Sequence, residues 1–321
     1  MSIRLLAAVI VVAWGCVAAA PIHADAIDVR ARVLPFDATA DPERTRVGRL
    51  VARRGVAEVL RSRFGGLSSL RVAPDGIGFT TVSDEGWRVD GRMVYDPQGR
   101  LTGVEGVMLV PLLSRRGWPL PELGKHESDA ESLVRDTDGT LVIGFEGDHR
   151  IVRYPPGGAA PSLVAPPPGL QRAPVNSGLE TLVRLRDGRL LAITEGLKVE
   201  GGVRGWIGGG KDGWQPFVWA TSGGFVPTDA TQLPSGELLV LERRFPPVGA
   251  RLRLLPATSI KPGEILDGTQ IARLEGSLQL DNMEGIDARR GPAGETLIWL
   301  ISDDNYSFLQ RTLLLLFRLV E

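Results

Sequence analysis

Carboxylate side chains stand at both ends of a short pattern that this sequence repeats. In "GLETLVRLRDGRLLAITEG", residues 178 to 196, Glu180 precedes an apolar run, Asp187-Gly188 is a turn signal, and Glu195 follows a second apolar run. Related stretches with the same order of parts are residues 66–86, 129–147, 229–244 and 283–305. Carboxylate oxygens bind hard cations and accept protons in general base catalysis, so this repetition could supply either chemistry.

Each stretch is typical of a β-hairpin, because two runs rich in Val, Leu and Ile flank a turn of the Asp-Gly type. The apolar residues anchoring the first strands are Leu70, Leu133, Leu182, Leu233 and Ile286, so the copies lie about 50 to 60 residues apart. Periods of that size indicate propellers or solenoids, and the chain lacks the apolar stripe at helical spacing that a helical solenoid needs. We therefore expect an all-β protein, a β-propeller of six blades, with residues 92–112 contributing to a degenerate copy.

The composition allows one large domain. The chain has 321 residues, of which 43% are hydrophobic, with 40 glycines and 23 prolines. That is enough apolar material for the core of one propeller. The formal net charge of −1 and the lack of clusters of basic and aromatic residues argue against nucleic-acid binding.

The amino terminus is typical of a secretory signal. Arg4 precedes an apolar run that extends to about residue 20, and "HADA" offers cleavage after Ala24 or Ala26. We expect residues 1–26 to be this signal, residues 27–321 to form a single domain, and the mature protein to be periplasmic or secreted. Cys16 lies inside the signal, and the bulky Trp14 makes "AWGC" a poor lipid-attachment sequence, so no lipid anchor is expected. The mature chain then has no cysteine and needs no disulfide.

The apolar block "TLLLLFRL" at residues 312–319 is too short for a transmembrane span, so we interpret it as a buried strand. In a propeller the last strand can pair with the amino-terminal region, here residues 26–34 or 46–54, and so close the ring. Closure would hide both exposed sheet edges. We expect a monomer with no transmembrane segment in the mature chain.

Corresponding residues of successive blades converge at one rim of a propeller's channel. The residues expected there are Glu131, Glu180 and Glu284, with Asp229 nearby in the fourth copy. Several carboxylates brought together repel one another unless a cation or protons intervene. Calcium takes six to eight oxygen ligands in loose geometry, so these four residues are our predicted metal ligands and calcium the predicted cofactor.

Several common catalytic motifs are missing. The sequence has no G-x-S-x-G, which excludes the serine-hydrolase nucleophile elbow. Beyond the signal only His126 and His149 remain, too few for a histidine-rich zinc site. The remaining candidates for metal binding or catalysis are the carboxylate side chains, which act through their oxygen atoms.

The order of several segments resembles a known family, the secreted phytase-like proteins whose domain is called esterase-like activity of phytase. The resemblance covers about residues 45 to 320 and rests on "RFGGLSSL" (63–70), "SDEG" (83–86), "DAESL" (129–133), "FEGDHRI" (145–151), "NSGLETL" (176–182), "DNMEGIDA" (281–288) and "SDDNYSFLQRTLLLLFRL" (302–319). It implies a β-propeller rich in Glu and Asp, a phosphoesterase or phosphodiesterase type of activity, and calcium dependence.

A phosphoesterase on this scaffold would hydrolyse a small-molecule phosphoester with metal assistance. The carboxylates expected to act in catalysis are Glu195, as the acceptor of a proton from water, and Glu146. The arginines expected to bind the phosphate are Arg150, Arg243, Arg244 and Arg311, because a guanidinium matches phosphate in a bidentate way. The chain has only four lysines, and its 33 arginines are spread along it, so no crowded phosphate pocket is evident from the sequence.

Two other functions fit the same residues. A sugar-lactone hydrolase on a metal-binding propeller could use Glu180, Asn282 and Asp229. A non-catalytic periplasmic binding or scaffold propeller could use calcium only to tie its blades together. The sequence alone leaves these alternatives open.

Overall fold

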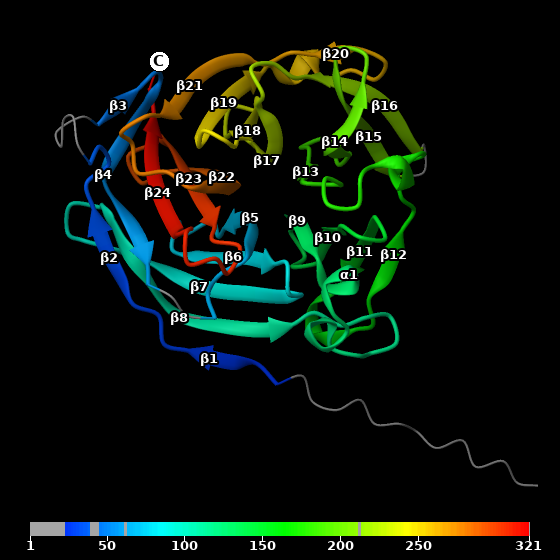
Figure 1. Cartoon of the computed structure of the whole chain (residues 1–321), viewed down its shortest axis with the longest axis horizontal. Helices are drawn as coiled ribbons and strands as arrows, with labels where there is room; N and C mark the ends of the chain where they lie inside the picture. The colour runs from blue at the N-terminus through cyan, green and yellow to red at the C-terminus, as the bar shows by residue number, and fades with distance from the viewer. Residues whose placement is uncertain (1–22, 39–44, 61–62, 211–212, 321) are drawn as a thin grey trace, which may run out of the picture.

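In the computed structural model, the described residues form five β-sheets around a common centre, antiparallel except for one short parallel pair at the edge of the third sheet (Figure 1). The structure describes residues 23–38, 45–60, 63–210 and 213–320. Among these residues, no helix is long and apolar enough to cross a membrane. The described residues are built mainly from strands, as the alternation of short apolar runs and turns predicts.

The sheets follow one another along the chain. The first sheet contains, from its outer edge inward, β1 (Asp25–Ile27), β8 (Leu101–Pro111), β7 (Trp87–Tyr95), β6 (Gly78–Ser83) and β5 (Leu67–Val72). The second contains β12 (Ser162–Val164), β11 (Arg150–Tyr154), β10 (Leu141–Phe145) and β9 (Ala130–Arg135). The third contains, from the centre outward, β13 (Thr181–Arg184), β14 (Leu190–Val199), β15 (Gly202–Gly210), β16 (Gly213–Ala220) and β20 (Ile265–Leu266).

The last two sheets complete the arrangement. The fourth contains β17 (Val226–Gln232), β18 (Leu238–Arg244), β19 (Gly249–Leu255) and β21 (Thr269–Glu275). The fifth contains β22 (Asn282–Arg290), β23 (Thr296–Asp303), β24 (Thr312–Leu319), β4 (Leu50–Val59) and β2 (Ala31–Leu34), with β3 (Arg46–Val47) paired to β4. The helical elements are α1 (Lys125–Ser128) and the 3-10 turns Leu120–Glu122, Pro156–Gly158, Leu170–Arg172 and Ala257–Ser259.

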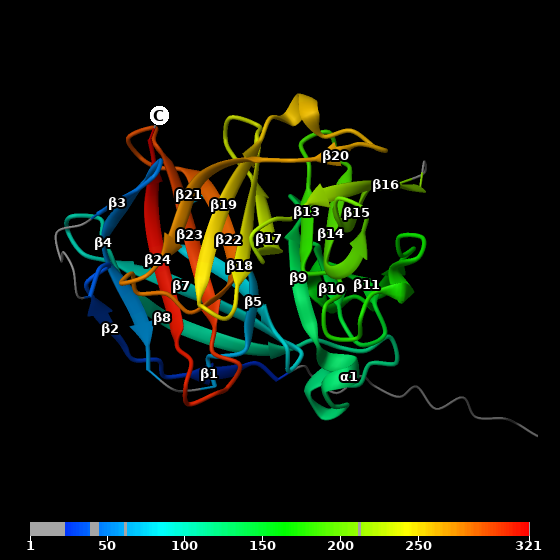
Figure 2. The same ribbon diagram turned by 45° about the horizontal axis from the view of Figure 1, so that its top comes forward.

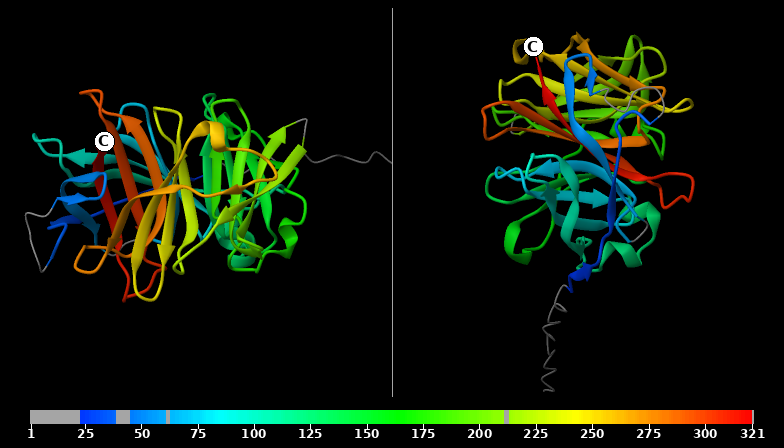
Figure 3. Two further views of the ribbon diagram at one scale, coloured as in Figure 1. Left: turned by 90° about the horizontal axis from the view of Figure 1, so that it is seen from above. Right: turned by 90° about the vertical axis from the view of Figure 1, so that its left-hand side faces the viewer.

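The innermost strands form a continuous ring. Strand β5 contacts β9, β9 contacts β13, β13 contacts β17, β17 contacts β22, and β22 contacts β5 again. Figure 1 shows these strands around the centre, and Figures 2 and 3 show the ribbon turned by 45° and by 90° from that view. The sixth blade that we expected is not present in the described residues, because residues 92–112 form most of β7 and β8 and complete the first sheet.

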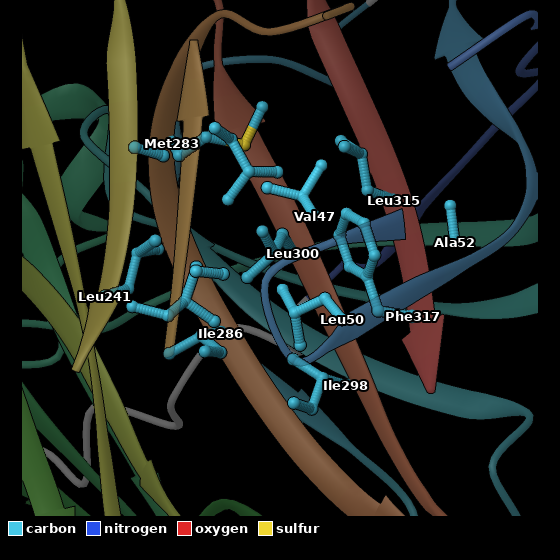
Figure 4. Close-up of a cluster of buried hydrophobic side chains, with 14 of the residues drawn as sticks. Val47, Leu50, Ala52, Leu241, Met283, Ile286, Ile298, Leu300, Leu315 and Phe317 are labelled. Atoms are coloured by element: carbon cyan, nitrogen blue, oxygen red, sulfur yellow. The ribbon is translucent and has the colours of Figure 1, made fainter. Parts of the chain in front are cut away.

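Buried apolar side chains form five clusters, one between each pair of neighbouring sheets. Figure 4 shows the cluster between the fourth and fifth sheets, where Leu241 of β18 faces Ile286, Leu300 and Phe317 of the fifth sheet. Strands in the middle of the sheets, such as β10 and β24, bury both faces and are almost continuously apolar rather than alternating with polar residues. This packing fixes the position of each inner strand relative to its neighbours.

The block "TLLLLFRL" is the buried strand β24, as predicted. Its side chains alternate between the two neighbouring clusters, with Leu313, Leu315 and Phe317 in one and Leu314 and Leu316 in the other. Strand β24 pairs with β23 on one side and with β4 on the other. The expected pairing with the amino-terminal region therefore involves residues 50–59, while β2, from the other candidate segment, pairs with β4.

The turn signals lie where hairpins were predicted. Gly76, Gly139, Gly188 and Gly236 all have positive φ, the conformation that glycine adopts at little cost. Asp187 Oδ1 accepts a hydrogen bond of 3.0 Å from the backbone N–H of Arg189, and the aspartates of the first two turns do the same two residues on. These local contacts set the hairpin register.

Most of the predicted signal sequence, residues 1–22, lies outside the described residues. The first described strand, β1, pairs with β8 at the outer edge of the first sheet. Cleavage after Ala24 would leave β1 whole, whereas cleavage after Ala26 would remove two of its three residues.

Candidate acidic site

The first set of carboxylates is presented by β-bulges at the start of the inner strands. Ala130 and Ser132 pair with consecutive residues of β10, so Glu131 is the extra residue of a bulge. Glu284 is likewise the extra residue between Met283 and Gly285 in β22. Bulges re-aim a side chain away from the regular alternation of a strand. Glu180 reaches the same end of the ring by directly preceding β13.

The second set follows the second strand of each hairpin. Leu133 pairs with Ile143 and Leu182 pairs with Ala192, and the carboxylates lie three residues beyond these partners, at Glu146 and Glu195. In the fifth sheet Ile286 pairs with Leu300, and the residue three positions beyond Leu300 is Asp303. Because a hairpin returns the chain to the end where it began, both sets lie at one end of the ring, as expected.

The fourth sheet departs from the predicted equivalence. Ala230 pairs with Val240, so the residues in the two rim positions are Thr228 and Arg243. Thr228 is the extra residue of the bulge in β17, and its hydroxyl donates to the backbone oxygen of Met283 at 3.0 Å. Aligning the copies on Leu233 was wrong, because backbone pairing and the distance to the turn set the register, and Leu233 lies beyond β17.

Glu242, which precedes Arg243 in β18, is a buried structural residue. It accepts hydrogen bonds of 2.9 Å from the indole of Trp219, 2.5 Å from Arg251 and 3.0 Å from Arg253. The rim carboxylates that remain are Asp129, Glu131, Glu146, Glu180, Glu195, Glu284 and Asp303, which we call the acidic rim.

Three members of the acidic rim offer oxygen atoms to a common point. Carboxylate oxygens of Asp129, Glu131 and Glu146 all lie within 4.8 Å of one another. Asp129 and Glu146 are buried, with 3% and 4% exposure. Glu131 also accepts a hydrogen bond of 2.7 Å from the hydroxyl of Ser68 in the first sheet. This arrangement fits the oxygen-rich donor set of a hard divalent cation.

Asp129 is a candidate ligand that the sequence analysis did not find. It precedes β9 by one residue and closes the short helix α1, where Lys125 Nζ contacts its Oδ1 at 2.9 Å. It belongs to no repeated position, so the repeat could not reveal it. The only available signal was a second acidic residue two positions before Glu131.

The buried carboxyls of Glu146 and Glu180 adjoin one another. Repulsion by Glu146 adds to burial in raising the pKa of Glu180. The backbone N–H of Gly178 donates to Glu146. A side chain at residue 178 would meet His149 Nδ1 at 2.6 Å, which explains the glycine in "NSGLE".

Arg243 is the cation inside the acidic rim. Its NH2 lies 2.7 Å from Glu195 Oε1, and its NH1 lies 2.7 Å from Glu284 Oε1. NH1 also donates to Asn282 Oδ1 at 2.5 Å, and the amide of Asn282 donates to Glu284 at 2.8 Å. The guanidinium therefore joins three neighbouring sheets through ion pairs and an amide.

Burial and mutual repulsion favour the protonated forms of these carboxyls. Burial raises the pKa of Glu131 and of Glu180 well above the usual range, and neighbouring carboxylates raise it further. Burial raises the pKa of Glu284 to about 8, even though Arg243 opposes the shift. Burial also raises the pKa of Asp303 to about 7. Without a cation, the acidic rim must hold protons near neutral pH.

Asp229, predicted as a metal ligand, lies deeper in the ring and pairs with Arg71. Both oxygens of Asp229 accept hydrogen bonds of 3.1 Å from this guanidinium. The backbone N–H of Ile286 and the hydroxyl of Ser69 also donate to it, at 3.0 and 3.1 Å. The structure thus does not bring Asp229 to the acidic rim, because the rim position of β17 belongs to Thr228.

The other three arginines predicted to bind phosphate have partners elsewhere. Arg150 donates to Asp148 and to the backbone oxygen of Glu127. Arg244 donates to Glu275 at 3.0 Å, and Arg311 donates to Gln279 at 2.7 Å. Within the described residues, Arg243 is the only one of the four predicted arginines that contacts the acidic rim.

Several solved structures match this chain, all at low sequence identity and with TM-scores below 0.5. A gluconolactonase from Xanthomonas campestris is 11% identical, with 93% of this chain and 99% of that chain covered and a TM-score of 0.48. The PQQ-bound aldose sugar dehydrogenase from Streptomyces coelicolor is 16% identical, with 90% and 98% covered and a TM-score of 0.38. Virginiamycin B lyase from Staphylococcus aureus is 12% identical, with 77% and 70% covered and a TM-score of 0.39.

No curated protein matches the sequence. The sequence profile of a phytase-like family, described as esterase-like activity of phytase, matches residues 62–306. This span includes every residue of the acidic rim and the inner strands of all five sheets. The chain therefore belongs to the phytase-like family, which carries the description esterase-like activity of phytase.

Proposed function

We propose that this protein is a calcium-dependent phosphoesterase whose acidic rim holds the metal. One observation carries the proposal: seven carboxyl groups meet at one end of the ring, and Arg243 and Lys125 are the cations that contact them in the described residues. Such an excess of negative charge is costly to bury without a further cation or bound protons. Membership of the phytase-like family supports hydrolysis of a phosphoester as the reaction.

The residues present suit calcium. Asp129, Glu131 and Glu146 would hold the ion, with Glu180 as a fourth ligand beside Glu146. These are oxygen donors only, and calcium accepts many oxygens in irregular geometry. A bound calcium ion would supply positive charge to phosphate oxygens and lower the pKa of a water molecule.

Two further side chains are placed to take part in hydrolysis. The hydrogen bonds of Arg243 to Glu195 use Oε1, which leaves Oε2 to accept a proton from water. The Arg243 side chain is 26% exposed, so its guanidinium is accessible to an anion while Glu195 and Glu284 hold its orientation. We assign Glu195 as the general base and Arg243 as the phosphate-binding residue. Glu146, the second predicted catalytic residue, suits the role of a metal ligand better.

An activity panel tests this proposal. The substrates are p-nitrophenyl phosphate, bis(p-nitrophenyl) phosphate and a sugar lactone, each assayed with calcium and with EDTA. We expect calcium-dependent release of p-nitrophenol and a loss of at least about 100-fold in kcat for Glu195→Gln, which is the lower end of the range for one general base. The matched control is Glu105→Gln, whose side chain is 65% exposed on another sheet. Lactone hydrolysis without phosphoester turnover, or silence on every substrate, would overturn the proposal.

A further inference from the structure

A cavity lies at the opposite end of the ring from the acidic rim. Its volume is about 840 Å³, and its lining includes the far ends of the inner strands, at Arg71, Arg135, Arg184, Gln232 and Arg289. The inner strands start at the acidic rim and end at this cavity. The two sites therefore open at the two ends of the same ring.

The charged lining of this cavity is mainly arginine. Its arginines are Arg71, Arg135, Arg184, Arg186, Arg289 and Arg290, and its acidic residues are Asp136, Asp138 and Asp287. We call these six arginines the basic mouth. The formal charge of these nine side chains is six minus three, or +3, which is opposite to the charge of the acidic rim.

Half of the basic mouth is neutralised by carboxylates. Arg71 pairs with Asp229 in the interior of the ring. Asp136 accepts hydrogen bonds of 2.9 and 3.0 Å from Arg184, and Asp287 lies 2.8 Å from Arg289. These three guanidiniums are structural, and their ion pairs account for two of the acidic lining residues.

The other three guanidiniums are held by uncharged oxygens. Arg186 donates to the backbone oxygens of Pro234 at 2.7 Å and Leu233 at 3.3 Å, and Arg290 donates to that of Gly294 at 3.0 Å. Arg135 donates to the hydroxyl of Thr80 at 3.4 Å. Carbonyl and hydroxyl partners orient a guanidinium without cancelling its charge. Within the described residues, these three side chains keep both their positive charge and unused N–H donors.

Asp138 offsets one of these three positive charges. Its carboxylate accepts the backbone N–H of Thr140 at 2.9 Å, and this hydrogen bond lowers the pKa of Asp138, so the side chain stays ionised in the turn between β9 and β10. Three unpaired guanidiniums against one carboxylate leave a formal charge of three minus one, or +2. The uncompensated charge of the cavity is therefore positive.

We propose that the basic mouth binds a small anion bearing more than one phosphate charge, independently of calcium. Arginine forks match phosphate oxygens in a bidentate way, and three forks from three different sheets can surround one ligand. A cavity of this volume accommodates a small phosphorylated molecule. The buried ion pair of Arg71 and Asp229 lies between the two ends of the ring, so the anion site is separate from the acidic rim.

Calorimetric titration with pyrophosphate in the presence of EDTA tests this site. We expect one pyrophosphate per chain, weaker binding of inorganic phosphate, and affinity that falls as salt increases. Arg135→Gln, Arg186→Gln and Arg290→Gln should each weaken pyrophosphate binding about tenfold, since each removes a charged hydrogen-bond donor. Arg186→Lys should retain part of the affinity because it keeps the charge. The matched control is Arg92→Gln, an arginine 57% exposed outside the cavity.

The outcomes separate this site from the proposed active site. Glu131→Gln should leave pyrophosphate binding unchanged in EDTA, so failure of the calcium proposal would not affect the result. Absence of pyrophosphate binding, tighter binding of citrate than of pyrophosphate, or equal weakening by Arg92→Gln would each overturn the proposal. Thermal melting without ligand checks that the variants, which alter accessible side chains, remain folded.

Discussion

Arg243 and Glu195 occupy the same position in neighbouring sheets, each three residues beyond the partner of an inner-strand residue, and their side chains lie 2.7 Å apart. The fourth sheet thus carries an arginine at the position where the second, third and fifth sheets carry carboxylates. Its guanidinium ties the third sheet to the fifth through Glu195 and Glu284. Arg243 therefore supplies positive charge inside the acidic rim and lies beside the candidate metal ligands.

Replacing Arg243 by Met should destabilise the metal-free protein. Removing one partner of a buried ion pair costs about 3 to 5 kcal/mol, and the 26% exposure of Arg243 reduces this to about 2 kcal/mol. The measurement is urea unfolding in EDTA. Arg88→Met is the control, because Arg88 and Asp90 are both 37% exposed. An Arg243 variant no less stable than the control would show that the rim carboxyls do not depend on this cation.

Calcium should stabilise the folded protein through Glu131 and Glu146. Binding to the folded state alone raises the free energy of unfolding by about 2.7 kcal/mol at a hundredfold excess over Kd. Glu131→Gln and Glu146→Gln should lose most of this calcium response in a thermal melt, while Glu105→Gln retains it. If the parent melts at the same temperature in calcium and in EDTA, the rim does not bind this ion.

Asp229→Asn separates a structural carboxylate from a metal ligand. It leaves Arg71 without its charged partner in the interior of the ring, so a loss of about 3 kcal/mol or more is expected. The increase in melting temperature with calcium should nevertheless equal that of the parent. If this variant lost the calcium response, Asp229 would be a calcium ligand, contrary to our assignment.

The metal-free protein should become less stable as pH rises from about 4 to about 8. Glu284 and Asp303 have pKa values of about 8 and about 7 when folded, above the usual value near 4, so the folded state binds more protons than the unfolded state in this range. Stability falls with pH wherever the folded state binds the extra protons. Calcium should reverse the trend, because it binds the ionised carboxylates. Urea midpoints in EDTA that rise from pH 5 to pH 8 would contradict this expectation.

Ending the chain at Arg311 should abolish cooperative folding. The deletion removes β24, which lies in the middle of the fifth sheet between β23 and β4 and contributes to two apolar clusters. Both neighbours would be left with unpaired edges. Circular dichroism melts test this, and a truncated protein that melts as sharply and as high as the parent would show that the ring does not depend on β24.

The sequence by itself determined the strands, the turns and most of the acidic rim. Turn residues such as Asp187-Gly188 and apolar runs act locally, so the hairpins could be predicted from them, and a repeat of about 50 residues indicated a propeller. The positions of Glu131, Glu180 and Glu284 followed because each lies at a constant distance from such a turn or strand.

The tertiary structure decided what depends on pairing between distant segments. The described residues form five sheets because residues 92–112 pair within the first sheet, and no local pattern distinguishes that pairing from a new blade. The pairing of β17 with β18 places Thr228 and Arg243 in the two rim positions of the fourth sheet. Asp229 instead pairs with Arg71, since one extra residue in a strand reverses which side chain faces the channel. The basic mouth consists of arginines from several sheets. Only the fold decides which of these arginines have a carboxylate partner and which keep an uncompensated charge.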